Sequence, residues 1–288
     1  MTDNKTNINW YPGHMAKAKK EIKESLKLVD VLIELIDARI PYSSKNPDID
    51  ELANNKPRVL LINKADLADD RVTADFKSYY ESKGYFVLIT NARNGNLKPV
   101  MNVVREACKE KIERDKARGM INRPIRAMIL GIPNVGKSTF INSYAKKACT
   151  KTGDKPGVTT GKQWIRLSKE LELLDTPGIL WPKFEDQKVG LHIAMIGSIN
   201  ENILDSHDLA LNLLKYLVQS YPGAVNSRYG VLEKEDSLEL LYDICAKKAC
   251  LKKGGEPDTD RMSFTITDDF RGGKFGKVSL EKVSDFIK

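Results

Sequence analysis

The sequence lacks the residue patterns of several protein classes. Only four cysteines and three histidines occur in 288 residues, and no two cysteines form a CxxC pair. We therefore expect no structural zinc site, and scattered cysteines are typical of reduced thiols in a cytoplasmic protein. No apolar run approaches the roughly 20 residues that a membrane span needs. The N-terminus has no apolar segment of a secretion signal. We expect a cytoplasmic protein without a membrane partner.

Internal repeats, low-complexity tracts, zinc-finger patterns and RNA-recognition-motif signatures are also missing. Charge is not balanced, because the formal net charge is +8. Between Lys146 and Lys169, seven lysines or arginines face a single acidic residue, Asp154. Such a tract is either a solvated basic surface or a contact for a polyanion, and RNA is the polyanion considered below.

Strands and helices alternate in the first part of the chain. Buried strands are expected at 29–36, 57–62, 85–89, 126–130 and 171–174, with helices between them, including a long one from Leu97 to Ile112. This alternation predicts an α/β domain with a mostly parallel sheet. Further on, Asp205-Ser206 and Asp236-Ser237 are typical helix caps. We expect an α/β domain at 1–185, a linker at 186–199 and a small all-α domain at 200–288.

A phosphate-binding loop follows the strand at 126–130. Gly131 to Ser138 reads GIPNVGKS, the G-x-x-x-x-G-K-S pattern, and a plausible helix comes next. Glycines let backbone N–H groups surround phosphates at a helix N-terminus, where those groups are unpaired. Lys137 would reach the β- and γ-phosphates, and the Ser138 hydroxyl would bind Mg²⁺.

Two later segments are candidates for the γ-phosphate and the metal. In ELLDTPGIL, a strand delivers Asp175 to the Mg²⁺ shell, and the N–H of Gly178 can touch the γ-phosphate. In DKPGVTTGKQW, either Thr159 or Thr160 can complete the Mg²⁺ coordination, with Thr159 favoured. The alternative interpretation is that DTPG is a plain turn between strands and that Thr159 is only a β-branched loop residue.

The guanine-reading loops lie upstream of the phosphate loop. In VLLINKAD, the Asp66 carboxylate matches the N1–H and N2–H donors of guanine, whereas adenine would leave this charge unpaired. Asn63 would tie this loop to the phosphate loop, and the Lys64 stem would cover the base. Thr90-Asn91-Ala92 follows the next strand, where a second loop can touch the base oxygen. Taken alone, NKAD is also compatible with a polar turn.

The order of these loops is rearranged relative to an ordinary GTPase, which begins with the phosphate loop. A circular permutation explains it, because the termini of compact domains often lie close together. The expected fold is therefore a circularly permuted P-loop GTPase domain plus a small all-α C-terminal domain. The residues expected to bind GTP or GDP are Asn63, Lys64, Asp66, Thr90, Asn91, Ala92, Gly131, Asn134, Val135, Gly136, Lys137, Ser138, Thr139, Thr159, Asp175 and Gly178.

The chain resembles the RbgA/YlqF family of circularly permuted ribosome-assembly GTPases. The matching segments are NWYPGHMAKA, DARIP, NKADL, GIPNVGKST, PGVTT, DTPGIL and DFRGGKFGKVSLE, which span nearly the whole chain. The resemblance implies a factor for late maturation of the large (50S) ribosomal subunit, a GTPase activity stimulated by the ribosomal particle, and a helical domain that contacts rRNA. We expect a monomer when free and no DNA partner.

The machinery for hydrolysis departs from ordinary GTPases in one position. Ile179 follows DTPG, where many GTPases carry a glutamine that orients the attacking water. The resemblance points instead to His14 in YPGHMAKA, either orienting water or binding rRNA phosphate. Catalytic roles are thus expected for His14, Lys137 and Gly178. Asn134 resembles the asparagine of potassium-activated GTPases and is a candidate K⁺ ligand, or a turn-forming residue.

Three surfaces are candidates for RNA: Trp10 and Tyr11 with the following basic helix, the basic tract at 146–169, and the segment Arg271 to Lys277. Trp10 and Tyr11 can alternatively pack across the domain. The rival hypothesis is a guanine-nucleotide-controlled, protein-binding regulator without an RNA target. A role in small-subunit maturation is disfavoured, because the chain has no room for the N-terminal OB domain and zinc site of that permuted family.

Overall fold

The computed structural model divides into two compact units. It describes residues 20–53, 56–94, 96–120, 123–152, 164–174, 186–199 and 205–286. Among these, the helical unit comprises Leu67–Asp69 and the residues from 186 to Leu280. The sheet unit comprises the remaining described residues, from Lys20 to Asp66, from Asp70 to Leu174 and from Glu281 to Phe286.

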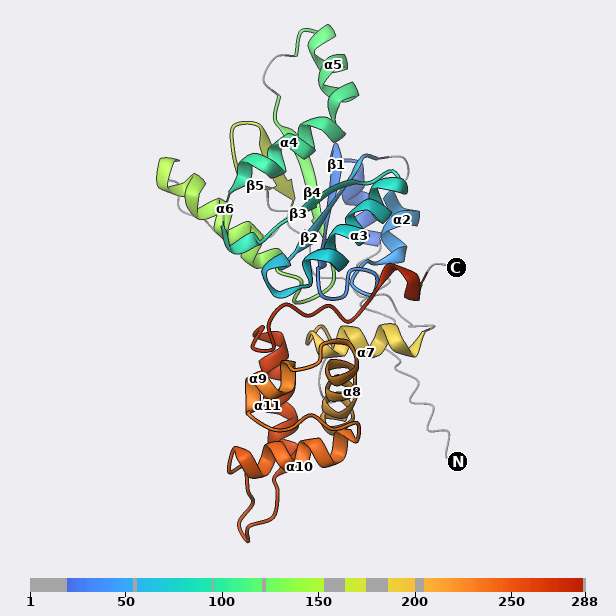
Figure 1. The fold of residues 1–288 in the computed structure, drawn as a ribbon. Helices are drawn as coiled ribbons and strands as arrows, with labels where there is room; N and C mark the ends of the chain where they lie inside the picture. Colours follow the sequence, from blue (N-terminus) through green and yellow to red (C-terminus); the bar gives the residue numbers. More distant parts are fainter. Residues whose placement is uncertain are drawn as a thin grey trace. The chain divides into compact units, whose positions relative to one another are not determined.

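A six-stranded sheet forms the centre of the sheet unit (Figure 1). The strand order is β3-β2-β1-β4-β6-β5, and all neighbours are parallel except β5 and β6. The strands are β1 (Val31–Asp37), β2 (Arg58–Asn63), β3 (Phe86–Ile89), β4 (Ile125–Leu130), β5 (Trp164–Arg166) and β6 (Leu171–Leu174). The mostly parallel α/β sheet predicted from the sequence is confirmed; β5, which was not expected, adds an antiparallel edge.

Burial explains why the central strands are mostly apolar. Every residue of β1 is buried, as expected for a parallel strand with both faces covered. Helices α2 (Pro47–Ala53), α3 (Asp70–Ser82), α4 (Leu97–Ala107), α5 (Lys109–Ala117) and α6 (Lys137–Thr152) follow the strands, and residues 20–26 are also helical. The long helix expected from Leu97 to Ile112 is divided at Cys108, where α4 ends and α5 begins.

The helical unit is built on α7 (Gln187–Met195), α8 (Ser206–Ser220), α9 (Ala224–Tyr229), α10 (Ser237–Lys247) and α11 (Thr259–Arg271). Asp205 and Asp236 cap α8 and α10 as the sequence predicted. Leu213, Leu241 and Phe270 are among the side chains of its core. None of the helices within the described ranges is long and apolar enough to cross a membrane.

Two expected boundaries differ from the structure. The segment 186–199 was expected as a linker, but it contains α7, whose buried residues belong to the helical unit. The expected helical domain 200–288 also ends early, because the chain returns to the sheet unit at Glu281. The short 3₁₀ helix η4 (Val283–Asp285) there contacts α3.

Candidate nucleotide site

The loops predicted to bind a nucleotide leave the sheet at one edge. Asn63 ends β2, Thr90 follows β3, and Gly131 follows β4. These strands are parallel members of one sheet, with β1 between β2 and β4, so their carboxyl ends lie on the same side. Open parallel sheets bind ligands at this edge. The structure thus brings together three loops that are far apart in the sequence.

Glycine is required at both ends of the phosphate loop. Gly131 has φ +146° and Gly136 has φ +101°, a region that side chains rarely adopt. A Cβ at Gly131 would lie 2.5 Å from the Leu35 carbonyl oxygen, and one at Gly136 would lie 2.4 Å from Nδ2 of Asn63. At these two positions the loop packs too closely against Leu35 and Asn63 for any side chain.

Lys137 opens α6 and turns back over the phosphate loop. Its Nζ donates to the carbonyl oxygens of Gly131 and Ile132, both at 2.8 Å. Ser138 and Thr139 follow in the first turn and are exposed, as is Asn134 in the loop. The ammonium group and the N-terminus of α6 thus lie together, and the N-terminus of a helix favours anions.

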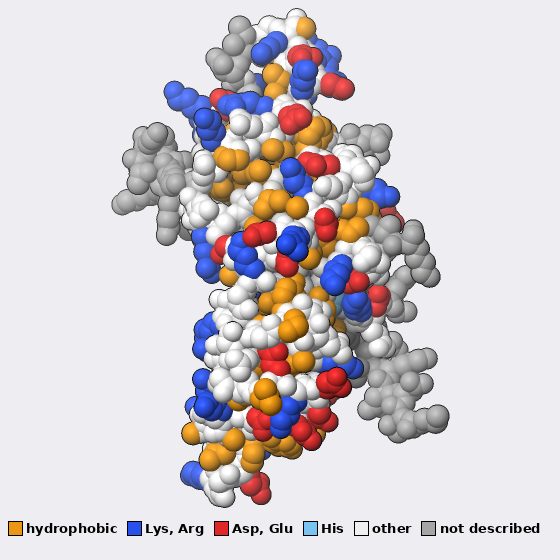
Figure 2. All heavy atoms as spheres, in the orientation of Figure 1, with side chains coloured by type: hydrophobic (Ala, Val, Ile, Leu, Met, Phe, Trp, Pro, Cys, Tyr) orange, Lys and Arg blue, Asp and Glu red, His pale blue; other side chains and the backbone are white. Residues whose placement is uncertain are grey.

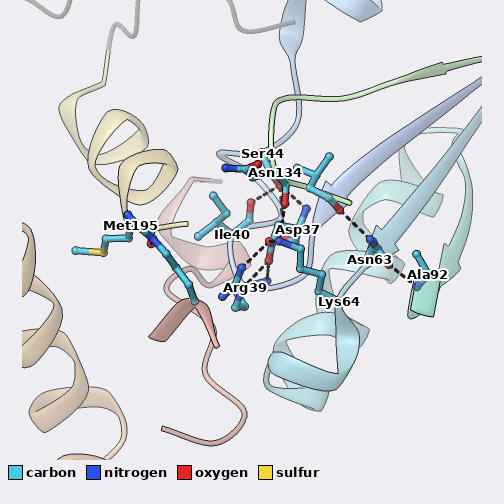
Figure 3. A network of polar contacts seen from close by, with 11 residues as sticks. Asp37, Arg39, Ile40, Ser44, Asn63, Lys64, Ala92, Asn134 and Met195 are labelled. Atoms are coloured by element: carbon cyan, nitrogen blue, oxygen red, sulfur yellow. Dashed lines mark hydrogen bonds and ion pairs between the residues drawn. The ribbon is translucent and has the colours of Figure 1, made fainter. Parts of the chain in front are cut away.

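Asn63 ties all three loops together (Figure 3). Its Nδ2 donates to the Val135 carbonyl oxygen of the phosphate loop at 2.8 Å. Its Oδ1 accepts a hydrogen bond from the backbone N–H of Ala92 in the second base loop, also at 2.8 Å. The side chain is 2% exposed, so these two hydrogen bonds satisfy a buried amide. The tie between base loop and phosphate loop expected from the sequence is present.

Lys64 is held from two sides. Its backbone is left-handed, with φ +60°, and its Nζ donates to the Asn134 carbonyl oxygen. The same Nζ lies 2.9 Å from Oδ2 of Asp37, a fully buried carboxylate at the end of β1. Asp66, two residues on, is exposed at the start of the 3₁₀ turn η1 (Ala65–Leu67). The backbone of Ala65 donates to Thr90 at 3.3 Å, which joins the two base loops.

Asp37 and Arg39 form a buried ion pair beside this loop. Oδ1 accepts from Nε of Arg39 at 2.9 Å, and Oδ2 accepts from Nη2 at 2.8 Å. Burial would raise the pKa of Asp37, but Arg39 and Lys64 outweigh it and hold that pKa well below its usual value. The motif DARIP was noted in the sequence without a role. An acidic residue at the end of a buried strand was the available signal.

Several predicted site residues lie outside the described part of the chain. These are His14, Thr159, Thr160, Asp175, Gly178 and the neighbouring Ile179, together with Trp10 and Tyr11. Asn91 is described, and its Oδ1 accepts a hydrogen bond from the N–H of Arg93 within η2 (Ala92–Asn94). Within the described ranges, no group of three His, Cys, Asp or Glu side chains could hold a metal ion.

Comparison with known proteins identifies the family. A family model described as "50S ribosome-binding GTPase" matches residues 126–243. Ribosome biogenesis GTPase A of Bacillus cereus is 49% identical over 281 residues, covering 97% of this chain and 95% of the relative. The protein of the same name from Thermotoga maritima is 30% identical over 278 residues, covering 96% of this chain and 95% of the relative.

Solved structures agree with this assignment. The crystal structure of GNP-bound YlqF from T. maritima superimposes with a TM-score of 0.67 at 27% identity, covering 92% of this chain and 98% of that one. The GDP-bound structure of T. maritima YlqF gives the same TM-score and identity, and the match covers that chain completely. The chain therefore belongs to the ribosome biogenesis GTPase A family and is a guanine-nucleotide-binding enzyme that hydrolyses GTP.

Proposed function

We propose that this GTPase acts in late maturation of the large (50S) ribosomal subunit in the cytoplasm, and that the ribosomal particle stimulates its hydrolysis of GTP. The observation that supports this most strongly is the similarity to ribosome biogenesis GTPase A along almost the whole chain. The rearranged order of base loops and phosphate loop is part of that similarity, and the hydrogen bonds of Asn63 join them into one site.

The base loops read guanine in this proposal. The exposed Asp66 carboxylate accepts hydrogen bonds from N1–H and the 2-amino group, while the Lys64 stem covers the base. Thr90, Asn91 and Ala92 line the second loop near the base oxygen. Replacing Asp66 by Asn would suit xanthine, which has a carbonyl where guanine has its 2-amino group. D66N should therefore bind XDP more tightly than GDP, in a competition experiment against a fluorescent nucleotide. Retained preference for GDP would remove Asp66 from base recognition.

The phosphate loop holds the phosphates and the metal. Backbone N–H groups from Asn134 to Thr139 surround them, and Lys137 exchanges its carbonyl partners for phosphate oxygens. Mg²⁺ prefers hard oxygen ligands, and the exposed Ser138 hydroxyl at the start of α6 fits it. Thr159 and Asp175 are proposed to complete the coordination, with Thr160 as the alternative to Thr159. Bound Mg²⁺ would neutralise charge on the β- and γ-phosphates.

Hydrolysis needs a group that places water, because Ile179 has no polar side chain. We assign this role to His14, with the N–H of Gly178 contacting the γ-phosphate. Asn134 is exposed in the phosphate loop with a left-handed backbone, φ +62°, and its side-chain oxygen is the proposed K⁺ ligand. Equal turnover in sodium and potassium buffers would remove the K⁺ site.

The rRNA contact is proposed for the basic tract at 146–169 and the basic segment that follows Trp10 and Tyr11. The segment Arg271 to Lys277 contributes less than its sequence suggested. Arg271 donates to the carbonyl oxygens of Ala194 and Met195 at the end of α7, and Lys274 pairs with Asp269. Figure 2 shows acidic side chains interspersed with the basic ones on the face that it draws.

The test is GTP turnover in potassium buffer with and without purified large ribosomal subunits. We expect strong stimulation by the subunits, lost in H14A while cosedimentation with the subunits is retained. Loss of cosedimentation in H14A would make His14 a contact residue instead. A wild-type protein that binds GTP tightly but is not stimulated would support the alternative, a regulator that binds a protein partner in a salt-insensitive way.

A further inference from the structure

The loop that follows β1 lies directly beside the base-reading segment. In the parallel register of β1 and β2, Asp37 is paired with Asn63, the first residue of NKAD. The backbone N–H of Ala38 donates to the Asn63 carbonyl oxygen at 2.8 Å. The end of β1 is therefore hydrogen-bonded to the segment that is proposed to read the base.

Asp37 can accept four hydrogen bonds, and the structure provides four donors. Arg39 supplies its backbone N–H at 3.1 Å, together with Nε and Nη2. Lys64 supplies the fourth through its Nζ. Both side chains of the Asp37–Arg39 pair are at most 1% exposed, so neither charge can be satisfied by water. Removing one member would break a buried ion pair, which is strongly unfavourable.

The loop carrying these residues is itself closed. The Ser44 Oγ accepts from the backbone N–H of Asp37 at 2.9 Å and donates to the Ile40 carbonyl oxygen at 2.6 Å. Asp37 is thereby fixed in its backbone as well as in its side chain. Figure 3 shows Asp37, Arg39 and Lys64 converging at this point, with Asn63 reaching the other way towards Ala92.

Lys64 connects the fixed position of Asp37 to Asp66, the residue that is proposed to read the base. Its left-handed backbone is an unusual conformation for a lysine and needs surrounding contacts to persist. The contacts of its Nζ are the Asn134 carbonyl oxygen and the Asp37 carboxylate. Asp66 comes two residues later, in the single turn η1, and its charge also acts on Arg39. The pose of Asp66 thus depends on a backbone held by Lys64.

We propose that Asp37, with Arg39, is a positioning residue for guanine specificity: it holds Lys64, and through Lys64 the turn that presents Asp66 to the base. Asp37 does not touch the nucleotide in this proposal. The inference rests on the proposed base-reading role of Asn63 to Asp66, and the experiment separates the two.

The experiment measures dissociation constants of GDP and IDP for the full chain by competition with a fluorescent nucleotide. Inosine lacks the 2-amino group, so the IDP-to-GDP ratio reports how well Asp66 is placed. We expect D37N to weaken GDP binding by about tenfold and to lower the IDP-to-GDP ratio several-fold. A purely structural role would weaken both nucleotides by the same factor, and an unchanged ratio in D37N would overturn the proposal.

E281Q is the matched control. Glu281 is another fully buried carboxylate, and it binds the loop that begins at Asp37 through Tyr42 and Ser43. Its IDP-to-GDP ratio should remain that of the natural protein. A natural protein that does not distinguish GDP from IDP would instead refute the base-reading role of Asp66, whatever D37N does.

A double-mutant cycle provides the second measurement. K64M and D37N remove the two ends of the same ion pair, so the double variant should lower the IDP-to-GDP ratio no further than D37N alone. Residues that act as one unit are non-additive in this way. Additive effects would show that Asp37 and Lys64 act separately and would contradict the proposal.

Discussion

The carboxylate of Glu281 binds the backbone of Ser43, which lies 238 residues earlier in the chain. It accepts from the N–H of Tyr42 at 2.7 Å, from the N–H of Ser43 at 3.2 Å and from the Ser43 hydroxyl. Beyond it, Phe286 stacks on Tyr42 with ring centroids 3.9 Å apart. The segment from Glu281 to Phe286 therefore closes the outer side of the loop that begins at Asp37.

Replacing Glu281 by Gln should destabilise the sheet unit. Gln keeps the shape but loses the charge that three donors share, and buried hydrogen bonds to charged groups contribute about 1.5–3 kcal/mol each. We expect a fall of about 2 kcal/mol in the free energy of unfolding, measured by urea denaturation. S284A, at an exposed position in the same segment, is the control and should change little. Equal stability of E281Q and S284A would show that this carboxylate is not needed.

A methyl group at Gly136 should separate the phosphate loop from the base loop. G136A would place Cβ 2.4 Å from Nδ2 of Asn63, so the hydrogen bond to Val135 must be displaced. We expect GDP affinity to fall at least a hundredfold. G119A is the matched control, because Gly119 also has a left-handed backbone, φ +77°, with nothing near its added Cβ. G119A should lose only the roughly 1 kcal/mol of backbone strain and should bind GDP normally. Equal binding by both variants would contradict this role of Gly136.

Glu34 should make stability depend on pH. Burial, partly opposed by Lys45 and Arg58 and reinforced by Asp50, raises the pKa of this β1 carboxyl from 4.5 to about 7. The folded chain then keeps a proton that the unfolded chain releases, so stability falls as pH rises from about 4.5 to 7. Above pH 7, the free energy of unfolding of E34Q should exceed that of the natural protein by about 3 kcal/mol.

The measurement is urea denaturation of E34Q and the natural protein at pH 5 and pH 8. Gln retains the acceptor for the Asn46 N–H, which lies 3.0 Å from Oε1 of Glu34, so the comparison isolates the charge. E51Q, at an exposed carboxylate in α2, should follow the natural protein at both pH values. A stability difference between E34Q and the natural protein that does not grow towards pH 8 would mean that Glu34 titrates normally.

Replacing the charged side chain of Asp269 should destabilise the helical unit. Its Oδ2 accepts from Nε of Arg228 at 2.7 Å and from the Tyr229 hydroxyl at 2.8 Å, and its Oδ1 accepts from Nζ of Lys274 at 2.7 Å. D269N removes the charge that these donors share, but water reaches Arg228 and Lys274, so we expect a loss of about 1.5–3 kcal/mol. D268N, at the exposed neighbouring position, is the control. Thermal unfolding that is alike in the two variants would argue against this network.

Local sequence patterns predicted two kinds of element: buried strands made of apolar runs, and helices that begin at a capping residue. The apolar strands β1, β2 and β4 and the Asp-capped helices α8 and α10 are where they were expected. The run Thr265-Ile266-Thr267 is β-prone by residue type but lies in α11, because Ile266 and Phe270 at helical spacing are buried in the helical unit. Tertiary packing there outweighs local preference. The strand β5 is only three residues long, which is too short for a pattern.

The candidate site was predictable where a sequence motif has a known chemical role. The phosphate loop and NKAD specify residue types at fixed spacing, and Asn63 makes the hydrogen bond expected of it. The contacts that hold these loops were not predictable. Asp37 pairs with Lys64 from the neighbouring strand, and Glu281 binds Ser43, which is 238 residues away in the sequence. Such pairings depend on the fold as a whole and leave no periodic or local trace in the sequence.

The late return of the chain to the sheet unit has a consequence for synthesis. All six strands have been made once Leu174 is added, whereas the carboxylate that binds Tyr42 and Ser43 is added only at Glu281. At about 5–20 residues per second, the ribosome needs on the order of ten seconds for that interval. A nascent chain therefore passes through a stage in which the sheet can form while the loop beside the base-reading segment still lacks its fastening. Closure of that corner comes only after the helical unit has been translated.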